Sequence, residues 1–130
     1  RKAIDSARPI LEQLAERCPL VLVSNFYGNI ESVLKDFGLD HLFGAIVESA
    51  VVGIRKPDPA IFRLGVDKLG FPADEIVVVG DSYDKDIVPA TRIGCQTIWL
   101  KSIGWSAYKG NETADIVLSD FTEIKQVFAL

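Results

Sequence analysis

Apolar and polar residues in the first half of the chain follow two alternating spacings. Apolar positions between residues 4 and 18 recur at helical intervals, and the run PLVLVSN predicts a short strand, buried on both faces, that begins after Pro19. A second helical pattern over residues 30–37 ends at Gly38, and GAIVES predicts the next strand. Helices that alternate with buried strands are typical of βαβ units.

The second half of the chain continues this alternation. In KPDPAIFRLGVDKLG, Asp58 is placed as an N-cap, Pro59 as the first helical residue and Gly70 as the stop. The apolar run IVVVG predicts another strand. DIVPATRIG then predicts a helix with Pro89 in its first turn and Gly94 as its stop.

The last quarter of the chain supplies two further strands, CQTIWL and ADIVL, with a loop predicted over residues 101–114. A final helix is predicted from its inner face, formed by Phe121, Ile124 and Phe128. The whole pattern predicts one α/β domain over residues 1–130, a doubly wound parallel sheet with helices on both faces.

Composition and charge narrow the class of protein. A chain of 130 residues with 48% hydrophobic and 25% charged residues can bury a core of its own. The net charge of -4 and the lack of a basic run argue against a nucleic-acid partner, because such binding depends on Lys and Arg. No apolar stretch approaches the ~20 residues of a membrane span. Cys18 and Cys95 suit reduced core thiols, so we expect a soluble, cytoplasmic protein.

Polar residues at the carboxyl ends of the predicted strands are the candidates for chemistry, since ligands of open α/β sheets bind there. Ser24 follows VLV and precedes a helix, a place suited either to holding a phosphate oxygen or to capping the helix. Lys56 precedes Pro57 on a loop stiffened by two prolines. It suits either a cation aimed at a phosphoryl group or an ordinary solvated lysine, and the sequence leaves both alternatives open.

Three carboxylates follow the predicted strand IVVVG within six positions. Asp81 comes directly after Gly80, at a strand end where we expect it to be half desolvated and to need a partner. Magnesium takes oxygen ligands from one or two carboxylates together with substrate phosphate, so Asp81 and Asp86 together suit a magnesium site. Asp86 also opens the next predicted helix, where the helix dipole alone favours an acid, and we expect Asp84 to face water.

The stretches VLVSN, RKPDP and GDSYDKD, in this order, resemble the second, third and fourth motifs of the haloacid dehalogenase (HAD) superfamily. The sequence that flanks these motifs resembles subfamily IA of this superfamily, in which a cap is inserted after the first core strand. The resemblance implies a HAD-like Rossmannoid core with three α/β/α layers. It also implies hydrolysis of a small phosphorylated metabolite with Mg2+ as cofactor, through an aspartyl-phosphate.

The same resemblance implies a role for each matching residue. Ser24 would hydrogen-bond the transferring phosphoryl group with assistance from Asn25, and Lys56 would bridge that group and the nucleophile. Asp81 would ligate Mg2+, and Asp86 would support the metal site directly, through Lys56 or through water. The catalytic set implied by the family is therefore Ser24, Lys56 and Asp81.

The aspartate that attacks phosphorus in this family ends the first core strand, and no such acid precedes Ser24 here. The acids before it, Asp5, Glu12 and Glu16, all fall in the first predicted helix. We therefore expect residues 1–18 to be the helix that returns from a missing cap, residues 19–130 to be the core, and this chain alone to be inactive. The alternatives are a 2-haloacid dehalogenase-like hydrolase, a receiver-like domain and a non-catalytic phosphate-binding module.

A missing first strand has a structural consequence. In the family's sheet it lies between the strand that carries Ser24 and the strand that carries Asp81, so its absence leaves two strand edges exposed. We expect these two strands either to pair directly and close the gap, or to bind a second molecule and form a homodimer.

Overall fold

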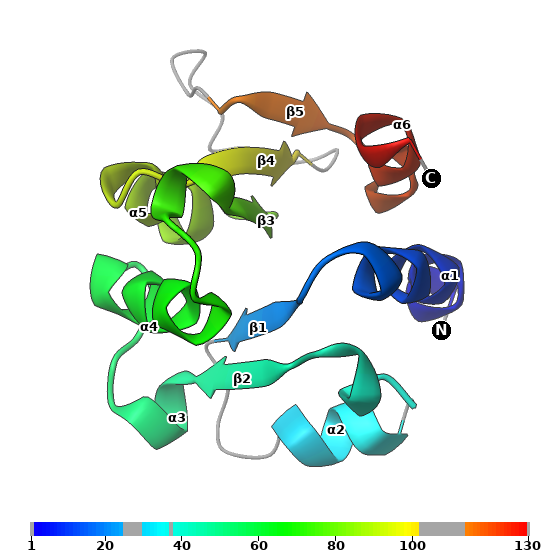
Figure 1. Cartoon of the computed structure of the whole chain (residues 1–130), viewed down its shortest axis with the longest axis horizontal. Coiled ribbons are helices and arrows are strands. Elements are labelled where there is room, and N and C mark those ends of the chain that lie inside the picture. Colours follow the sequence, from blue (N-terminus) through cyan, green and yellow to red (C-terminus); the bar gives the residue numbers. More distant parts are fainter. Residues whose placement is uncertain (1, 25–29, 37, 102–113, 130) are drawn as a thin grey trace.

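The chain is described by a computed structural model that covers residues 2–24, 30–36, 38–101 and 114–129. Its helices and strands alternate along the sequence (Figure 1). In chain order they are α1 (Lys2–Arg17), β1 (Val21–Ser24), α2 (Ile30–Asp36), η1 (Asp40–Leu42), β2 (Ala45–Glu48), α3 (Ser49–Val52), α4 (Pro59–Leu69), η2 (Ala73–Glu75), β3 (Val77–Gly80), η3 (Tyr83–Ile87), α5 (Val88–Arg92), β4 (Gln96–Leu100), β5 (Ile116–Leu118), η4 (Phe121–Glu123) and α6 (Ile124–Phe128). Most of the loop predicted over residues 101–114 lies outside the described residues.

Local signals in the sequence place the ends of α4 correctly. The Asp58 carboxylate accepts a hydrogen bond of 3.0 Å from the backbone N–H of Ala60, and Pro59 is the first residue of the helix. Gly70 ends it with a φ of 76°, a left-handed conformation that glycine adopts without strain. Both the predicted start and the predicted stop of this helix are therefore confirmed.

All strand pairings are parallel, but the strands form two sheets. Strand β1 pairs with β2, from Val21 opposite Ala45 to Ser24 opposite Glu48. Strands β3, β4 and β5 form the other sheet in that order. Figure 1 shows the two sheets one above the other, with α1 and α6 on one side and α4 and α5 on the other. The prediction of a parallel α/β fold with helices on both faces is confirmed.

Each side of the sheets has its own apolar core. On one side α1 and α6 pack against β4 through a cluster formed by Ile10, Leu14, Ile98 and Ile124. On the other side Ile61 and Phe62 of α4 pack with Val47 of β2, and α4 also lies close to β1. Gly65 permits that approach, because a Cβ placed there would lie 3.1 Å from Cγ2 of Val23. The helices thus hold the strand ends, and the residues that follow them, in fixed positions.

Strands β1 and β3 do not pair with each other, so the expectation that they close the gap directly is wrong for this structure. A cleft of about 580 Å³ separates them, lined by apolar residues of both strands and by α1, α4 and α6. The prediction that β1 is fully buried is also wrong. The four residues of β1 are only half-buried, and Val79 in β3 is 39% exposed. The reason is that each strand faces the cleft along one edge.

The two cysteines differ in burial. Cys95 is buried between η2, α5 and β3, as predicted for a core thiol, whereas Cys18 is exposed just after the end of α1. Both are free thiols, as expected. Within the described ranges, no helix has the length and apolar character needed to cross a membrane.

Candidate functional site

Three of the predicted residues line one end of the cleft. Lys56 lies in the loop between α3 and α4, Asp81 follows β3, and Asp86 belongs to η3. Nζ of Lys56 is 2.7 Å from Oδ1 of Asp86, and the two side chains are only 16% and 7% exposed. A lysine held in this way is not a solvated loop residue. Of the two alternatives left open by the sequence, the structure therefore favours a lysine whose ammonium group is held in place to bind an anionic group.

The carboxylate of Asp86 is fixed on its other oxygen as well. The backbone N–H of Ser82 donates to Oδ2 at 3.2 Å, and the hydroxyl oxygen of Ser82 accepts from the backbone N–H of Lys85. Gly80 makes this packing possible, because a Cβ at that position would lie 2.6 Å from Cγ of Asp86. The sequence Gly80-Asp81-Ser82 thus forms a close-fitting support for a buried carboxylate.

Lys56 also contacts an aromatic ring. Its Nζ lies 5.7 Å from the centre of the Phe62 ring, and Phe62 is 4% exposed in the core beneath α4. Buried aromatic rings attract ammonium groups over their faces, and the lysine stem packs on apolar surface. Lys56 is therefore held between a ring and a carboxylate, with its ammonium group at the wall of the cleft.

Asp81 has a different environment from the one predicted. Its side chain is exposed and not half desolvated, because the residue leaves β3 at the open end of the cleft. Its backbone carbonyl accepts a hydrogen bond of 3.3 Å from Nε1 of Trp99. Among the residues that the structure describes, its carboxylate forms no ion pair or hydrogen bond, so it is available to a ligand. Asp84 is exposed, as expected.

The described residues contain no group of three His, Cys, Asp or Glu side chains that could hold a metal ion. A magnesium ion needs fewer protein ligands, because it keeps several waters and binds through one or two carboxylates and substrate phosphate. Asp81 offers an exposed carboxylate at the cleft, whereas both oxygens of Asp86 already accept protein donors. This donor set fits magnesium with Asp81 as ligand and Asp86 as support.

Ser24 is less closely connected to this group. It is the last residue of β1, half-buried, and pairs with Glu48 in the register of the sheet. Its neighbour Val23 lines the cleft, but Ser24 is not among the lining residues. Asn25 lies outside the described residues. The structure thus brings Lys56, Asp81 and Asp86 together and leaves Ser24 at the adjoining strand end.

Two buried polar residues near Ser24 were not among the predicted site residues. Glu48 and Ser49, at the end of β2 and the start of α3, are each only 5% exposed. Their signal was present in GAIVES, where an acid and a hydroxyl follow an apolar strand, at the edge of the sheet where ligands bind. Glu48 is a buried acid that lies opposite Ser24 in the register of β1 and β2.

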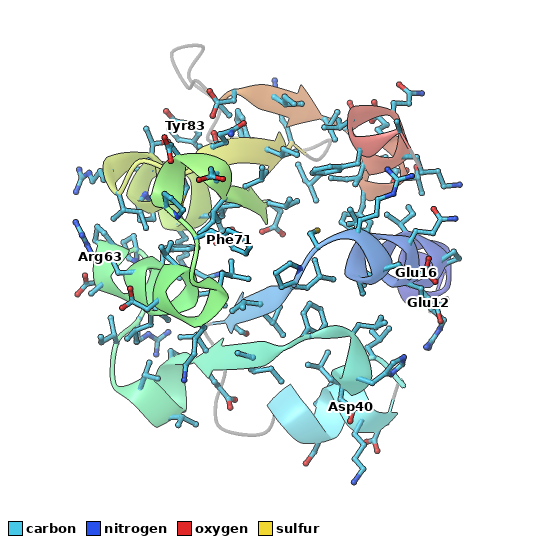
Figure 2. The ribbon with its side chains drawn as sticks, in the orientation of Figure 1. Glu12, Glu16, Asp40, Arg63, Phe71 and Tyr83 are labelled. Atoms are coloured by element: carbon cyan, nitrogen blue, oxygen red, sulfur yellow. The ribbon has the colours of Figure 1, made fainter. Side chains whose placement is uncertain are left out.

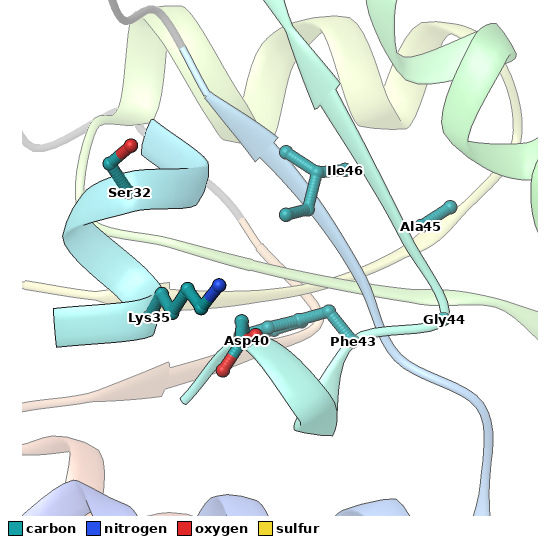
Figure 3. Close-up of a pocket in the computed structure, with 7 residues that line it drawn as sticks. All are labelled: Ser32, Lys35, Asp40, Phe43, Gly44, Ala45 and Ile46. Carbon is teal, nitrogen blue, oxygen red and sulfur yellow. The ribbon is translucent and has the colours of Figure 1, made fainter. Parts of the chain in front are cut away.

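A second cavity, of about 480 Å³, is lined by residues of α2, of η1 and of the beginning of β2 (Figure 3). Its polar side chains include Lys35 of α2 and Asp40 of η1, both exposed, and Phe43 and Ile46 form apolar walls. Of the predicted site residues that the structure describes, none lines it. The cleft between the sheets is therefore the better candidate for a functional site. Its walls are mainly apolar, and it also contains a buried ion pair and the exposed carboxylate of Asp81.

Comparison with known proteins identifies the family. The profile of the haloacid dehalogenase-like hydrolases matches residues 1–94. The chain is 36% identical over 91 residues to 5-amino-6-(5-phospho-D-ribitylamino)uracil phosphatase YigB of Escherichia coli, a match that covers 70% of this chain and 37% of the relative.

Two solved structures share the fold. A HAD phosphatase from Thermococcus onnurineus superposes with a TM-score of 0.83 at 28% identity, covering 92% of this chain and 55% of that one. A 2-haloacid dehalogenase from Pseudomonas syringae gives 0.82 at 27% identity, covering 95% and 52%. The chain thus spans about half the length of these structures and less of the curated relative. Residues 1–130 belong to the haloacid dehalogenase-like hydrolase family.

Proposed function

We propose that residues 1–130 form the phosphate- and magnesium-binding part of a phosphatase that hydrolyses monoesters of a small phosphorylated metabolite. The observation that carries this proposal is the Lys56–Asp86 ion pair, which lies at the same end of the cleft as the exposed carboxylate of Asp81. The phosphatase activity named for the Escherichia coli relative and for the Thermococcus onnurineus structure supports it.

Each site residue has a distinct task in this proposal. Lys56 binds a phosphoryl oxygen and offsets its charge, and Asp86 holds the lysine in place. Asp81 holds magnesium, with Asp86 as a supporting carboxylate, and Ser24 and Asn25 donate hydrogen bonds to the phosphoryl group. Magnesium, when bound, supplies positive charge that stabilises the transferring phosphoryl group.

The attacking group is not found among these residues. Asp5, Glu12 and Glu16, the acids before Ser24, all lie in α1, and Figure 2 shows Glu12 and Glu16 on this helix, on the side of the molecule away from η3. In this proposal Lys56, Ser24 and the metal position the phosphate and stabilise charge, and none of them is the attacking group. The proposal therefore includes an aspartate nucleophile from outside residues 1–130, which forms the aspartyl-phosphate, and predicts that this chain alone is inactive.

A binding experiment tests the site without requiring turnover. Mg2+ and inorganic phosphate would be titrated into the 15N-labelled chain, and the backbone amide shifts followed by NMR. We expect concerted, saturable shifts at residues 24, 56 and 80–82. Shifts confined to the second cavity, around Lys35 and Asp40, or no saturable shifts at all, would contradict the proposed site.

The structural match to a 2-haloacid dehalogenase gives a second candidate function. The family resemblance implies that metal-free dehalogenases replace the Gly-Asp-Ser of the fourth motif, whereas Gly80-Asp81-Ser82 is intact here. The two candidates differ in their products. A dehalogenase releases halide from a 2-haloacid in the presence of EDTA, whereas the proposed phosphatase requires magnesium and releases phosphate.

The exposed strand edges support a further part of the proposal, that the chain forms a homodimer through β1 and β3. Direct closure of the gap does not occur, which leaves two unpaired edges and a largely apolar cleft between them. Such edges readily pair with another chain. A cytoplasmic location suits the free thiols and the proposed substrate, a small metabolite.

A further inference from the structure

Trp99 contacts the candidate metal-binding residue from a neighbouring strand. It lies in β4, directly opposite Gly80 in the register of β3 and β4. Its side chain is 2% exposed, and its indole Nε1 donates a hydrogen bond of 3.3 Å to the carbonyl oxygen of Asp81. The register of β3 with β4 brings this indole under the loop that follows β3.

The peptide unit between Asp81 and Ser82 is held at both ends. Its carbonyl oxygen accepts from Trp99, and its N–H donates to Oδ2 of Asp86 at 3.2 Å. A peptide unit is planar, so two hydrogen bonds on opposite ends fix the orientation of the whole plane. Because both partners are buried, these bonds are shielded from competing water. Since Gly80 on the other side of Asp81 is held in β3, the backbone is fixed on both sides of Asp81.

The indole is itself fixed in place. The ring of Tyr83 lies 5.2 Å from that of Trp99, centre to centre, at an angle of 55°, a favourable tilted arrangement. Tyr83 is the first residue of η3, the segment that also carries Asp86. The same short segment thus supports both hydrogen-bond partners of the Asp81–Ser82 peptide.

We propose that Trp99 is a positioning residue that holds Asp81 in the orientation required to bind a divalent cation at the cleft. This inference rests on the proposed function, since it concerns the metal assigned to Asp81. Trp99 itself does not touch the cation. Its indole N–H keeps the backbone of Asp81 at one place beside Asp86, so that binding does not have to order the loop.

The experiment follows Mg2+ binding to the 15N-labelled chain by NMR. The chain has two tryptophans and therefore two indole N–H signals, which Trp105→Phe assigns. We expect the Trp99 signal to shift on Mg2+ addition with the same dissociation constant as the amides of residues 80–82. Asp81→Asn should abolish the coupled shift, because it removes the ligand and leaves the backbone carbonyl in place.

The decisive variant is Trp99→Phe, which removes the indole N–H and keeps an aromatic ring against Tyr83. We expect its Mg2+ affinity to fall by about tenfold or more, as for other residues that orient metal ligands. Ile98→Val is the matched control. Ile98 is 1% exposed in the same strand, so this substitution removes core packing but leaves the hydrogen bond to Asp81 in place. Its affinity should be unchanged.

Two outcomes would overturn the inference, and they are distinguishable. Equal Mg2+ affinity in the parent chain, Trp99→Phe and Ile98→Val would show that the metal site exists and that Trp99 does not position it. No Mg2+ binding by the parent chain at millimolar concentration would remove the proposed metal site itself, and the role of Trp99 with it.

Discussion

Lys56 and Asp86 form an ion pair of 2.7 Å between a loop that follows β2 and a segment that follows β3. The pair therefore links the ends of the two sheets across the cleft. It is largely buried, with side chains 16% and 7% exposed, so water does little to screen it. Removal of one partner leaves the other charge buried and uncompensated.

The first prediction concerns this pair. Lys56→Met should lower the free energy of unfolding by about 3 kcal/mol, because Asp86 remains buried without its cation. The double variant Lys56→Met, Asp86→Asn should recover a large part of that loss. Urea denaturation of the two variants measures both values, and Lys85→Met, at an exposed lysine of the same segment, should change stability by no more than about 0.5 kcal/mol. A double variant no more stable than Lys56→Met would show that the uncompensated charge of Asp86 does not cause the loss.

Gly80 provides the second prediction. Gly80→Ala should lower the free energy of unfolding by about 1–3 kcal/mol, because the new Cβ displaces the Asp86 carboxylate from beneath the strand end. Gly44→Ala is the matched control, since its Cβ would meet only the carbonyl oxygen of Leu20 at 3.7 Å. Thermal unfolding compares the two. Equally small losses of stability in Gly80→Ala and Gly44→Ala would contradict the close packing of Asp86 against Gly80.

The third prediction tests the exposed strand edges. Sedimentation of the chain over a wide range of concentration should show self-association, and Val79→Lys should abolish it by placing a charge on the unpaired edge of β3. Val117→Lys, at a residue of β5 that is 50% exposed, should leave self-association unchanged. A strictly monomeric parent chain would contradict the proposed homodimer.

The cysteines give a fourth prediction. Burial raises the pKa of the Cys95 thiol, so the reactive thiolate is scarce there in the folded chain, whereas Cys18 is exposed. A disulfide reagent at mildly alkaline pH should label one thiol quickly and the second only on unfolding. Because the folded state keeps Cys95 protonated, stability should decline as the pH rises above the ordinary thiol range. Rapid labelling of both thiols in the folded chain would contradict the described burial.

Local signals in the sequence were sufficient for the elements but not for their assembly. Asp58, Pro59 and Gly70 mark helix ends through their own backbone chemistry, which does not depend on distant residues. Periodicity carries no information on which strands pair, so the sequence could not show that β1 and β3 stand apart. The expectation of full burial for β1 failed for the same reason.

The candidate site shows the same division. Lys56, Asp81 and Asp86 could be selected because each follows an apolar strand, and parallel strands end at one edge of a sheet. The exposure of Asp81 and the hydrogen bond from Trp99 depend on the register of β3 with β4, which no local pattern specifies. The close approach of Asp86 to Gly80 likewise depends on the path of η3.

The most direct test of the proposed function is an assay of phosphate release from p-nitrophenyl phosphate. The assay compares residues 1–130 with a polypeptide that contains them and has the full length of the relatives. The longer polypeptide should release phosphate only with Mg2+, and EDTA, Asp81→Asn and Lys56→Met should each remove that activity, whereas residues 1–130 alone should be inactive. Halide release from 2-chloropropionate in the presence of EDTA, without phosphate release in Mg2+, would contradict the proposed function.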